Sequence, residues 1–210
     1  MKATLDEIAA HAIAVPWAVN STYRLAMSLI AGNIPGDFVE CGVYAGAHPA
    51  AMAEAIYDAK ATGRKVHLFD SFQGIPMTGP KDLDWHRGDP VKRPFGPPGL
   101  AEVTPGGDSV CSRQTVEANM AKWGVDPALL MYHEVWFRHT LPNNGIERIA
   151  LLRLHADLYE STKDCLEHLY SKVSVGGWCI CDDFTLDGCR EAVLPYLLKP
   201  WNCPVYWRVA

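Results

Sequence analysis

The segments Leu152-Arg-Leu-His-Ala-Asp-Leu-Tyr-Glu-Ser-Thr162 and Cys181-Asp-Asp-Phe184 decide how this chain is interpreted. Each segment lies at the end of an apolar run typical of a buried strand. In each, the apolar residues are followed by side chains that carry charge or bind metals. In an open α/β sheet, ligands bind at the carboxyl ends of the strands. We therefore expect Asp157 to meet Asp182 and Asp183 at one edge of a sheet, as in an active site.

The overall composition is that of one globular α/β domain covering residues 1–210, with 49% hydrophobic and 20% charged residues. A net charge of −5 argues against a nucleic-acid partner, which would require a basic stripe. No apolar run has the length of a membrane span, and the N-terminus does not have the pattern of a secretory signal. Seven cysteines without a C-x-x-C motif indicate reduced thiols, as expected in the cytoplasm.

Strand and helix patterns alternate along the chain. Helices are expected at 20–33, 46–61, 161–170 and 187–198. Strands are expected at 37–43, 65–70, 130–135, 148–154, 177–181 and 204–208. This order predicts a mostly parallel sheet with right-handed crossovers and helices on both faces, preceded by a helical cap within residues 1–35.

Residues 73–108 differ from the rest, because they hold seven of the fifteen prolines and many glycines. A loop of this length in a compact domain is a lid or binding loop, or is disordered. We favour a lid or substrate loop over a linker, since too little chain lies on either side for two independent domains.

The motif Val39-Glu-Cys-Gly-Val-Tyr-Ala-Gly46 lies between the first strand and its helix. Gly42 permits close approach of a ligand, and the helix N-terminus offers unpaired N–H groups. The dinucleotide fingerprint G-x-G-x-x-G is absent, and the looser acid-x-G-x-x-x-G pattern suits a ligand with a charged amino-acid part. Asp70, at the end of the second strand, is placed to accept hydrogen bonds from a ribose diol; alternatively, Asp70 or Ser71 caps the following segment.

Six motifs occur in an order that resembles the macrocin O-methyltransferase family, which includes the mycinamicin and aminocoumarin sugar methyltransferases. They are Glu40–Gly46, Leu68–Pro76, Phe137–Pro142, Leu152–Thr162, Gly176–Phe184 and Gly188–Val193. The resemblance implies a class I methyltransferase (Rossmann-like) fold, S-adenosylmethionine as methyl donor and a divalent ion such as Mg²⁺. It also implies that the acceptor is a sugar hydroxyl of a small-molecule glycoside or a glycan.

The resemblance also implies roles for individual residues. Cofactor binding would fall to Glu40, Gly42, Tyr44, Gly46, Asp70, Ser71, Trp136 and Phe137. Glu40 and Gly42 would lie at the methionine part, Asp70 at the ribose, and Trp136 with Phe137 at the adenine. Asp157 would be the general base, and Asp182 with Asp183 would be metal ligands.

Three features depart from the family pattern. His155 stands where the family has the first aspartate of Asp-x-Asp, a metal ligand. Gly46-Ala-His48 replaces the usual Gly-Gly-Ser. The chain after the last predicted helix is short, so the sheet is expected to be a strand short or to have a remodelled C-terminal edge.

The proposed chemistry requires a hydroxyl to lose its proton while it attacks a sulfonium methyl group. A bound cation lowers the hydroxyl pKa, and a carboxylate within hydrogen-bond reach removes the proton. A site with His155 beside Asp182 and Asp183 favours a transition metal over Mg²⁺. Two alternatives stay open: a metal held by the aspartates alone, or no metal, with His155 itself as the base.

Other interpretations compete with these. Asp182 and Asp183 would otherwise cap the helix near Asp187, and His48 would be structural or face a ligand. The substitutions His155 and His48 motivate a second function, a methyltransferase-like binding module without catalysis. A nicotinamide-dependent dehydrogenase is disfavoured by the missing glycines. Self-association into a homo-oligomer and the identity of the acceptor are not determined by these residues.

Overall fold

The computed structural model describes residues 2–12, 14–82, 109–197 and 205–209. The helices are α1 Leu5–His11, α2 Pro16–Ala31, α3 Ala47–Asp58, α4 Arg113–Trp123, α5 Phe137–Thr140, α6 Tyr159–Leu169 and α7 Asp187–Val193. The strands are β1 Asp37–Cys41, β2 Val66–Asp70, β3 Leu130–Glu134, β4 Ile149–Leu154, β5 Val173–Cys181 and β6 Val205–Arg208.

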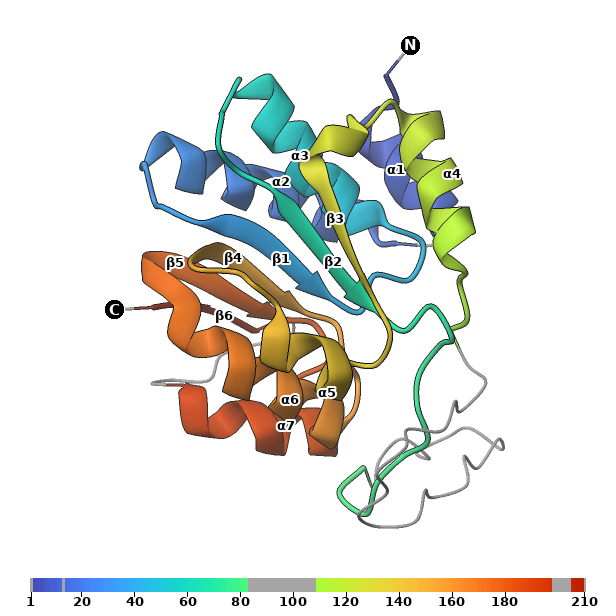
Figure 1. Cartoon of the computed structure of the whole chain (residues 1–210), viewed down its shortest axis with the longest axis vertical. Helices are drawn as coiled ribbons and strands as arrows, with labels where there is room; N and C mark the ends of the chain where they lie inside the picture. Colours follow the sequence, from blue (N-terminus) through green and yellow to red (C-terminus); the bar gives the residue numbers. More distant parts are fainter. Residues whose placement is uncertain (1, 13, 83–108, 198–204, 210) are drawn as a thin grey trace.

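These strands form one sheet in the order β3-β2-β1-β4-β5-β6 (Figure 1). All neighbouring pairs are parallel except β5 and β6, which are antiparallel. The predicted α/β class is therefore confirmed. At the C-terminal edge, the last strand pairs directly with β5, so the edge differs from a longer sheet in one of the two expected ways, as a missing strand or a remodelled edge. Strand order reverses between β1 and β4, the place where α/β sheets bind ligands.

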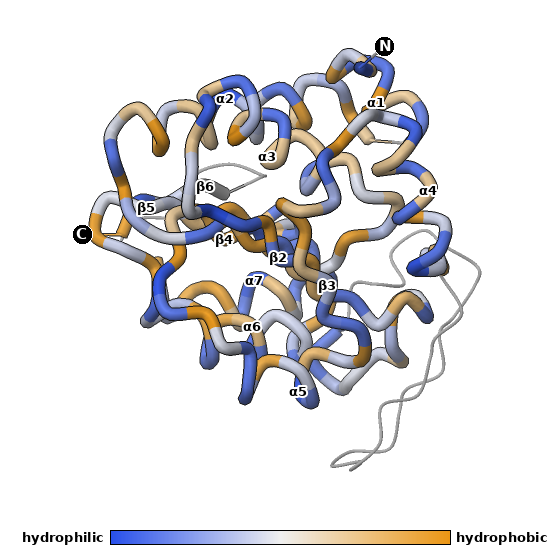
Figure 2. The backbone as a smooth tube through the Cα atoms, turned by 45° about the horizontal axis from the view of Figure 1, so that its top comes forward, coloured by the Kyte–Doolittle hydropathy of each residue, from blue (hydrophilic) through white to orange (hydrophobic). Residues whose placement is uncertain are grey.

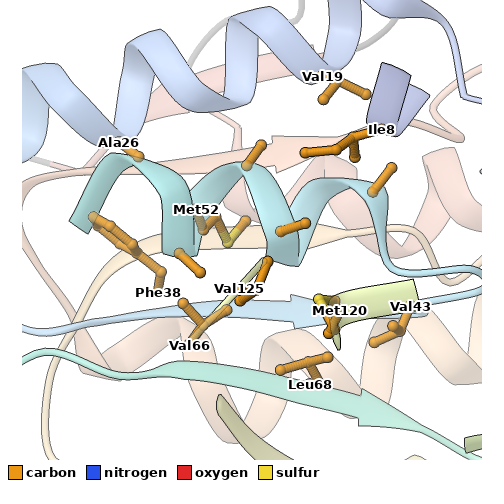
Figure 3. Close-up of a cluster of buried hydrophobic side chains, with 14 of the residues drawn as sticks. Ile8, Val19, Ala26, Phe38, Val43, Met52, Val66, Leu68, Met120 and Val125 are labelled. Carbon is orange, nitrogen blue, oxygen red and sulfur yellow. The ribbon is translucent and has the colours of Figure 1, made fainter. Parts of the chain in front are cut away.

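Helices cover both faces of the sheet, with α1 to α4 on one side and α5 to α7 on the other (Figure 1). The core under α3 joins Met52 of α3 to Phe38, Val66 and Leu68 of the strands, and Ile8 extends it from α1 (Figure 3). Hydrophilic positions lie mainly on the outer turns of the helices (Figure 2). Within the described residues, no helix has both the length and the apolar character needed to cross a bilayer.

Several predicted boundaries were wrong for identifiable reasons. α2 begins at Pro16 rather than at residue 20, because proline is favourable in the first turn of a helix. α7 ends at Val193 rather than at 198, because Pro195 follows and proline cannot donate the helical hydrogen bond. α4 was not predicted at all. The predicted segment 73–108 lies outside the described residues from 83 onward.

Candidate functional site

The carboxyl ends of four neighbouring strands are joined by hydrogen bonds just beyond the strands. Gly42 N donates to Phe69 O at 2.9 Å, and His155 N donates to Cys41 O at 2.9 Å. Asp182 N donates to Leu154 O at 3.1 Å. The segments after β1, β4 and β5 therefore lie side by side, as the sequence led us to expect.

Gly42 lies at the junction between β1 and β4. Its φ is +88°, and an added Cβ would lie 1.8 Å from the backbone oxygen of His155. No side chain fits in that space, and L residues disfavour that backbone conformation. Glycine at this position lets the first motif and the His155 segment approach each other closely.

Arg153, in the middle of the apolar strand β4, is the central charge of the site, with its side chain 1% exposed. Its Nε lies 3.3 Å from Glu40 Oε1, and its Nη2 pairs with Asp182. Nη1 donates to Thr22 Oγ1 at 3.0 Å, and Nη2 lies 3.1 Å from His48 Nε2. One guanidinium thus connects Glu40 of β1 and Asp182 after β5 to helices α2 and α3.

His48 is neutral in this arrangement. Its Nε2 accepts from Arg153, so the proton is on Nδ1, which donates to Thr22 Oγ1 at 3.1 Å. The Thr22 hydroxyl then donates to Ala18 O at 3.1 Å. Burial, together with the positive charge of Arg153, holds the pKa of His48 well below its usual range. Of the two interpretations left open for His48, the structure favours the structural one.

Glu40 is fully buried, and within the described residues neither of its carboxyl oxygens accepts a hydrogen bond. Burial raises its pKa well above the usual range; Arg153 opposes this shift, and Asp182 and Asp70 add to it. Buried polar groups without a partner are rare in proteins. Although Glu40 is ion-paired with Arg153 Nε at 3.3 Å, its oxygens remain able to accept hydrogen bonds from a cationic group such as the amino group of an amino-acid ligand.

Asp70 holds the turn after β1. Its Oδ2 accepts from Val43 N at 2.7 Å and Tyr44 N at 3.2 Å, and its Oδ1 accepts from Phe72 N at 2.8 Å. Burial outweighs these bonds and raises the pKa of Asp70. A carboxylate oxygen accepts more than one hydrogen bond, so a ribose diol still fits. Ser71 closes the next turn, accepting from Gln73 N at 3.0 Å.

Other predicted cofactor residues lie around this turn. Tyr44 is 36% exposed, whereas Gly46 is buried under α4, where an added Cβ would lie 2.7 Å from Met120 Cε. Core packing therefore gives Gly46 a structural reason to be glycine, and its cofactor role stays a prediction. Val135 N donates to Asp70 O at 3.2 Å, which places the following Trp136 and Phe137 beside the end of β2.

Asp183 contacts the predicted base segment rather than capping α7. Its Oδ2 accepts from Asp157 N at 3.1 Å, and α7 has no side-chain cap. Asp157 has a φ of +56°, a left-handed conformation. Burial and the neighbouring Asp182 raise the pKa of Asp183, while His155, Arg153 and the bond from Asp157 N oppose the shift.

The predicted metal ligands do not form a metal site in this arrangement. No group of three histidine, cysteine, aspartate or glutamate side chains suited to a metal occurs within the part of the chain that the structure describes. The Asp182 carboxylate pairs with Arg153. Two adjacent carboxylates repel each other unless a positive charge lies nearby, and Arg153 supplies that charge. In this arrangement, His155, Asp182 and Asp183 do not form a set that would hold a metal ion.

Sequence reasoning missed two members of this network, Arg153 and Thr22. Arg153 carried a signal, because it is the single charged residue in the apolar strand Ile149–Leu154. A buried arginine requires partners of opposite charge or good acceptors. Thr22 carried no signal, since its role depends on how α2 packs over the sheet.

Comparison with known proteins adds independent information. Residues 19–199 match the family model described as Macrocin-O-methyltransferase (TylF). The chain is 36% identical over 169 residues to 8-demethyl-8-(2,3-dimethoxy-alpha-L-rhamnosyl)-tetracenomycin-C 4'-O-methyltransferase of Streptomyces olivaceus, covering 80% of this chain and 60% of that protein. It is 32% identical over 211 residues to mycinamicin III 3''-O-methyltransferase of Micromonospora griseorubida, covering 95% and 78%.

Among solved structures, the O-methyltransferase NovP matches with a TM-score of 0.76 and 30% identity, covering 92% of this chain and 79% of that one. This match confirms the expected class I methyltransferase fold. The chain spans only 60% of the length of its tetracenomycin relative.

Proposed function

Because this chain belongs to the macrocin O-methyltransferase (TylF) family, we propose that it is an S-adenosylmethionine-dependent O-methyltransferase. Its acceptor is a sugar hydroxyl of a small-molecule glycoside or a glycan. The observation that carries the proposal is Glu40, a buried carboxylate without a hydrogen-bond partner among the described residues. The rhamnosyl group in the name of the tetracenomycin relative supports a sugar acceptor.

Glu40 would hold the amino group of the donor, and Asp70 would hold the ribose hydroxyls. Both acids lie near the carboxyl ends of the adjacent strands β1 and β2, and glycine at position 42 lets the turn after β1 pack closely against the backbone of His155. Trp136 and Phe137, beyond the end of β2, would line the adenine. When bound, S-adenosylmethionine supplies an electrophilic methyl group on a sulfonium.

Asp157 would remove the proton from the acceptor hydroxyl as the new C–O bond forms and the C–S bond breaks. The electron pair of the broken bond stays on sulfur, and the proton moves to the carboxylate. Proton transfer of this kind accelerates reactions by about 10²–10⁴-fold. His155, adjacent to the Asp157 segment, is the alternative base, because a neutral imidazole nitrogen can accept a proton.

Metal assistance remains a prediction from the sequence, and none of the steps above uses an ion. A chelation experiment decides it. Loss of turnover on dialysis against a chelator, restored by Mg²⁺ or Mn²⁺, would support an ion in the site. Unchanged turnover would support proton removal by protein side chains alone.

The first test is calorimetric titration with S-adenosylmethionine and with S-adenosylhomocysteine. We expect saturable binding of both. The second is transfer of a labelled methyl group to methyl α-L-rhamnopyranoside and to larger rhamnosyl glycosides. Absence of binding heat and of any thermal shift at high micromolar donor would refute the proposal.

A binding module without catalysis is the second candidate. The pairing of Asp182 with Arg153 favours it, because the acid is already neutralised within the protein. This candidate predicts donor binding without turnover on any sugar acceptor, and no effect of Asp157→Asn on the biological role of the protein.

A further inference from the structure

Asp82 is a buried carboxylate in the segment that follows β2. The residue is only 3% exposed. Its Oδ1 accepts from Tyr159 N at 2.8 Å, and its Oδ2 accepts from Gly79 N at 2.7 Å. Asp82 therefore contacts the first residue of α6 across 77 positions of sequence.

Helix α7 leaves space for this carboxylate. An added Cβ at Gly188 would lie 2.0 Å from Asp82 Oδ1 and 3.2 Å from the backbone oxygen of Lys81. A side chain at position 188 would have to displace Asp82. The contact thus depends on α7 as well as on α6.

The turn between β4 and α6 is held by a carboxylate at each end. Asp183 accepts from Asp157 N at 3.1 Å, and Asp82 accepts from Tyr159 N two residues later. Between them, Leu158 N donates to Ala156 O at 2.6 Å, a tight local turn. Asp157 has its left-handed conformation within this span.

We propose that Asp82 is a positioning residue that sets the orientation of Asp157 by fixing the turn at the start of α6. This inference rests on the proposed function, in which Asp157 is the base. An ionised acceptor at an unpaired helix N–H forms a strong, directional hydrogen bond. Because a displacement of about 1 Å at a reacting group lowers rates by about 10²-fold, small changes in this turn affect catalysis.

The test approaches the contact from two elements. Asp82→Asn weakens the hydrogen bond to Tyr159 N by changing its acceptor. Gly188→Ala places a Cβ on α7 where the Asp82 carboxylate lies, and so displaces that carboxylate. The matched control is Glu191→Gln, also an acid-to-amide change, at an exposed residue that pairs with Lys81 of the same segment at 2.6 Å. We would compare the three variants with the wild type in three measurements. These are steady-state kinetics with methyl α-L-rhamnopyranoside, donor titration, and amide exchange at residues 157–162.

Both site variants are expected to lower kcat by about 10- to 100-fold, with the donor Kd and KM changed by less than about 2-fold. Amide exchange at Tyr159 should accelerate in both, and Glu191→Gln should match the wild type. Unchanged kcat in both variants overturns the proposal, as does a parallel loss of donor affinity and thermal stability that accounts for the fall in kcat. Amide exchange tests the contact between Asp82 and Tyr159 independently of turnover. If the wild-type protein binds no donor, the proposed function fails, whatever the result for Asp82.

Discussion

Glu40 on the proposed donor side and Asp182 on the proposed acceptor side differ in how they are bonded, although both are ion-paired with Arg153. On the acceptor side, Asp182 pairs with Arg153 and Asp183 accepts from Asp157 N. On the donor side, Glu40 is more deeply buried and lies 3.3 Å from Arg153 Nε, yet its oxygens accept no hydrogen bond within the described residues. From this difference we expect the protein itself to organise the acceptor side and a bound ligand to complete the donor side.

Gly42 joins the two sides, and Gly42→Ala is expected to have the largest effect. The new Cβ would lie 1.8 Å from His155 O at a φ of +88°, so we expect little folded protein and a loss of more than about 3 kcal/mol in any that folds. Gly63→Ala is the control, because its φ is also positive, at +73°, with nothing within 4 Å. Thermal unfolding measures both; equal losses in the two variants would show that backbone strain, rather than the close approach, is responsible.

The acceptor side is tested by Asp157→Asn. Asparagine tolerates the left-handed backbone of this position, so the turn should be preserved. We expect kcat to fall by about 10²–10⁴-fold because the base is lost, with the donor Kd unchanged. His155→Gln is the comparison variant; a larger loss there than in Asp157→Asn would identify His155 as the base.

Arg153 connects the two sides, and Arg153→Met leaves two buried acids without their cation. Breaking a buried ion pair in this way typically costs about 3–5 kcal/mol. We expect a loss of that order in the free energy of unfolding, measured by denaturant titration. Arg113→Met, which removes an exposed arginine paired with Glu117 and Glu134, should change it by less than about 1 kcal/mol. Similar losses in both would contradict the central role of Arg153.

The donor side is tested by the pH dependence of donor affinity. Burial raises the pKa of Glu40, with Asp182 and Asp70 adding to the shift and Arg153 opposing it. A cationic ligand favours the ionised form, so binding releases a proton and tightens as pH rises through the raised pKa, by up to about 10-fold per pH unit.

Glu40→Gln removes this titration. We expect its donor affinity to vary less with pH and to be about 30-fold or more weaker than that of the wild type above the pKa of Glu40. Glu167→Gln, on the outer side of α6, should behave as the wild type. A wild-type profile as flat as that of Glu40→Gln would show that Glu40 does not bind the donor cation.

Local patterns predicted most of the fold because strands and helices follow from periodicity. The run Ile149–Leu154 is buried throughout, as its apolar residues indicate. The predicted ends of helices were wrong where a single residue decides the boundary, as Pro16 does at the start of α2. α4 has buried side chains only at Val116, Met120 and Trp123, so its helical pattern is weak.

The candidate residues could be selected from the sequence, but their pairing could not. The shared edge of a parallel sheet brought Glu40, His155 and Asp182 together, and that follows from strand order. The contact of Asp82 with Tyr159 spans 77 positions and depends on the packing of α6 and α7. No local pattern in the sequence predicts such a contact.

The sequence by itself determined the α/β class, the family and the residues able to carry the chemistry, because these depend on periodicity and on the order of short motifs. Only the tertiary structure decided which acids accept hydrogen bonds within the protein and which buried carboxylate accepts none from the described residues. The physical reason is that burial and charge pairing depend on distances of a few ångströms between segments far apart in the chain. Arg153 pairs with Asp182 while Glu40 accepts no hydrogen bond from the described residues, and that difference arises only when the strands are assembled.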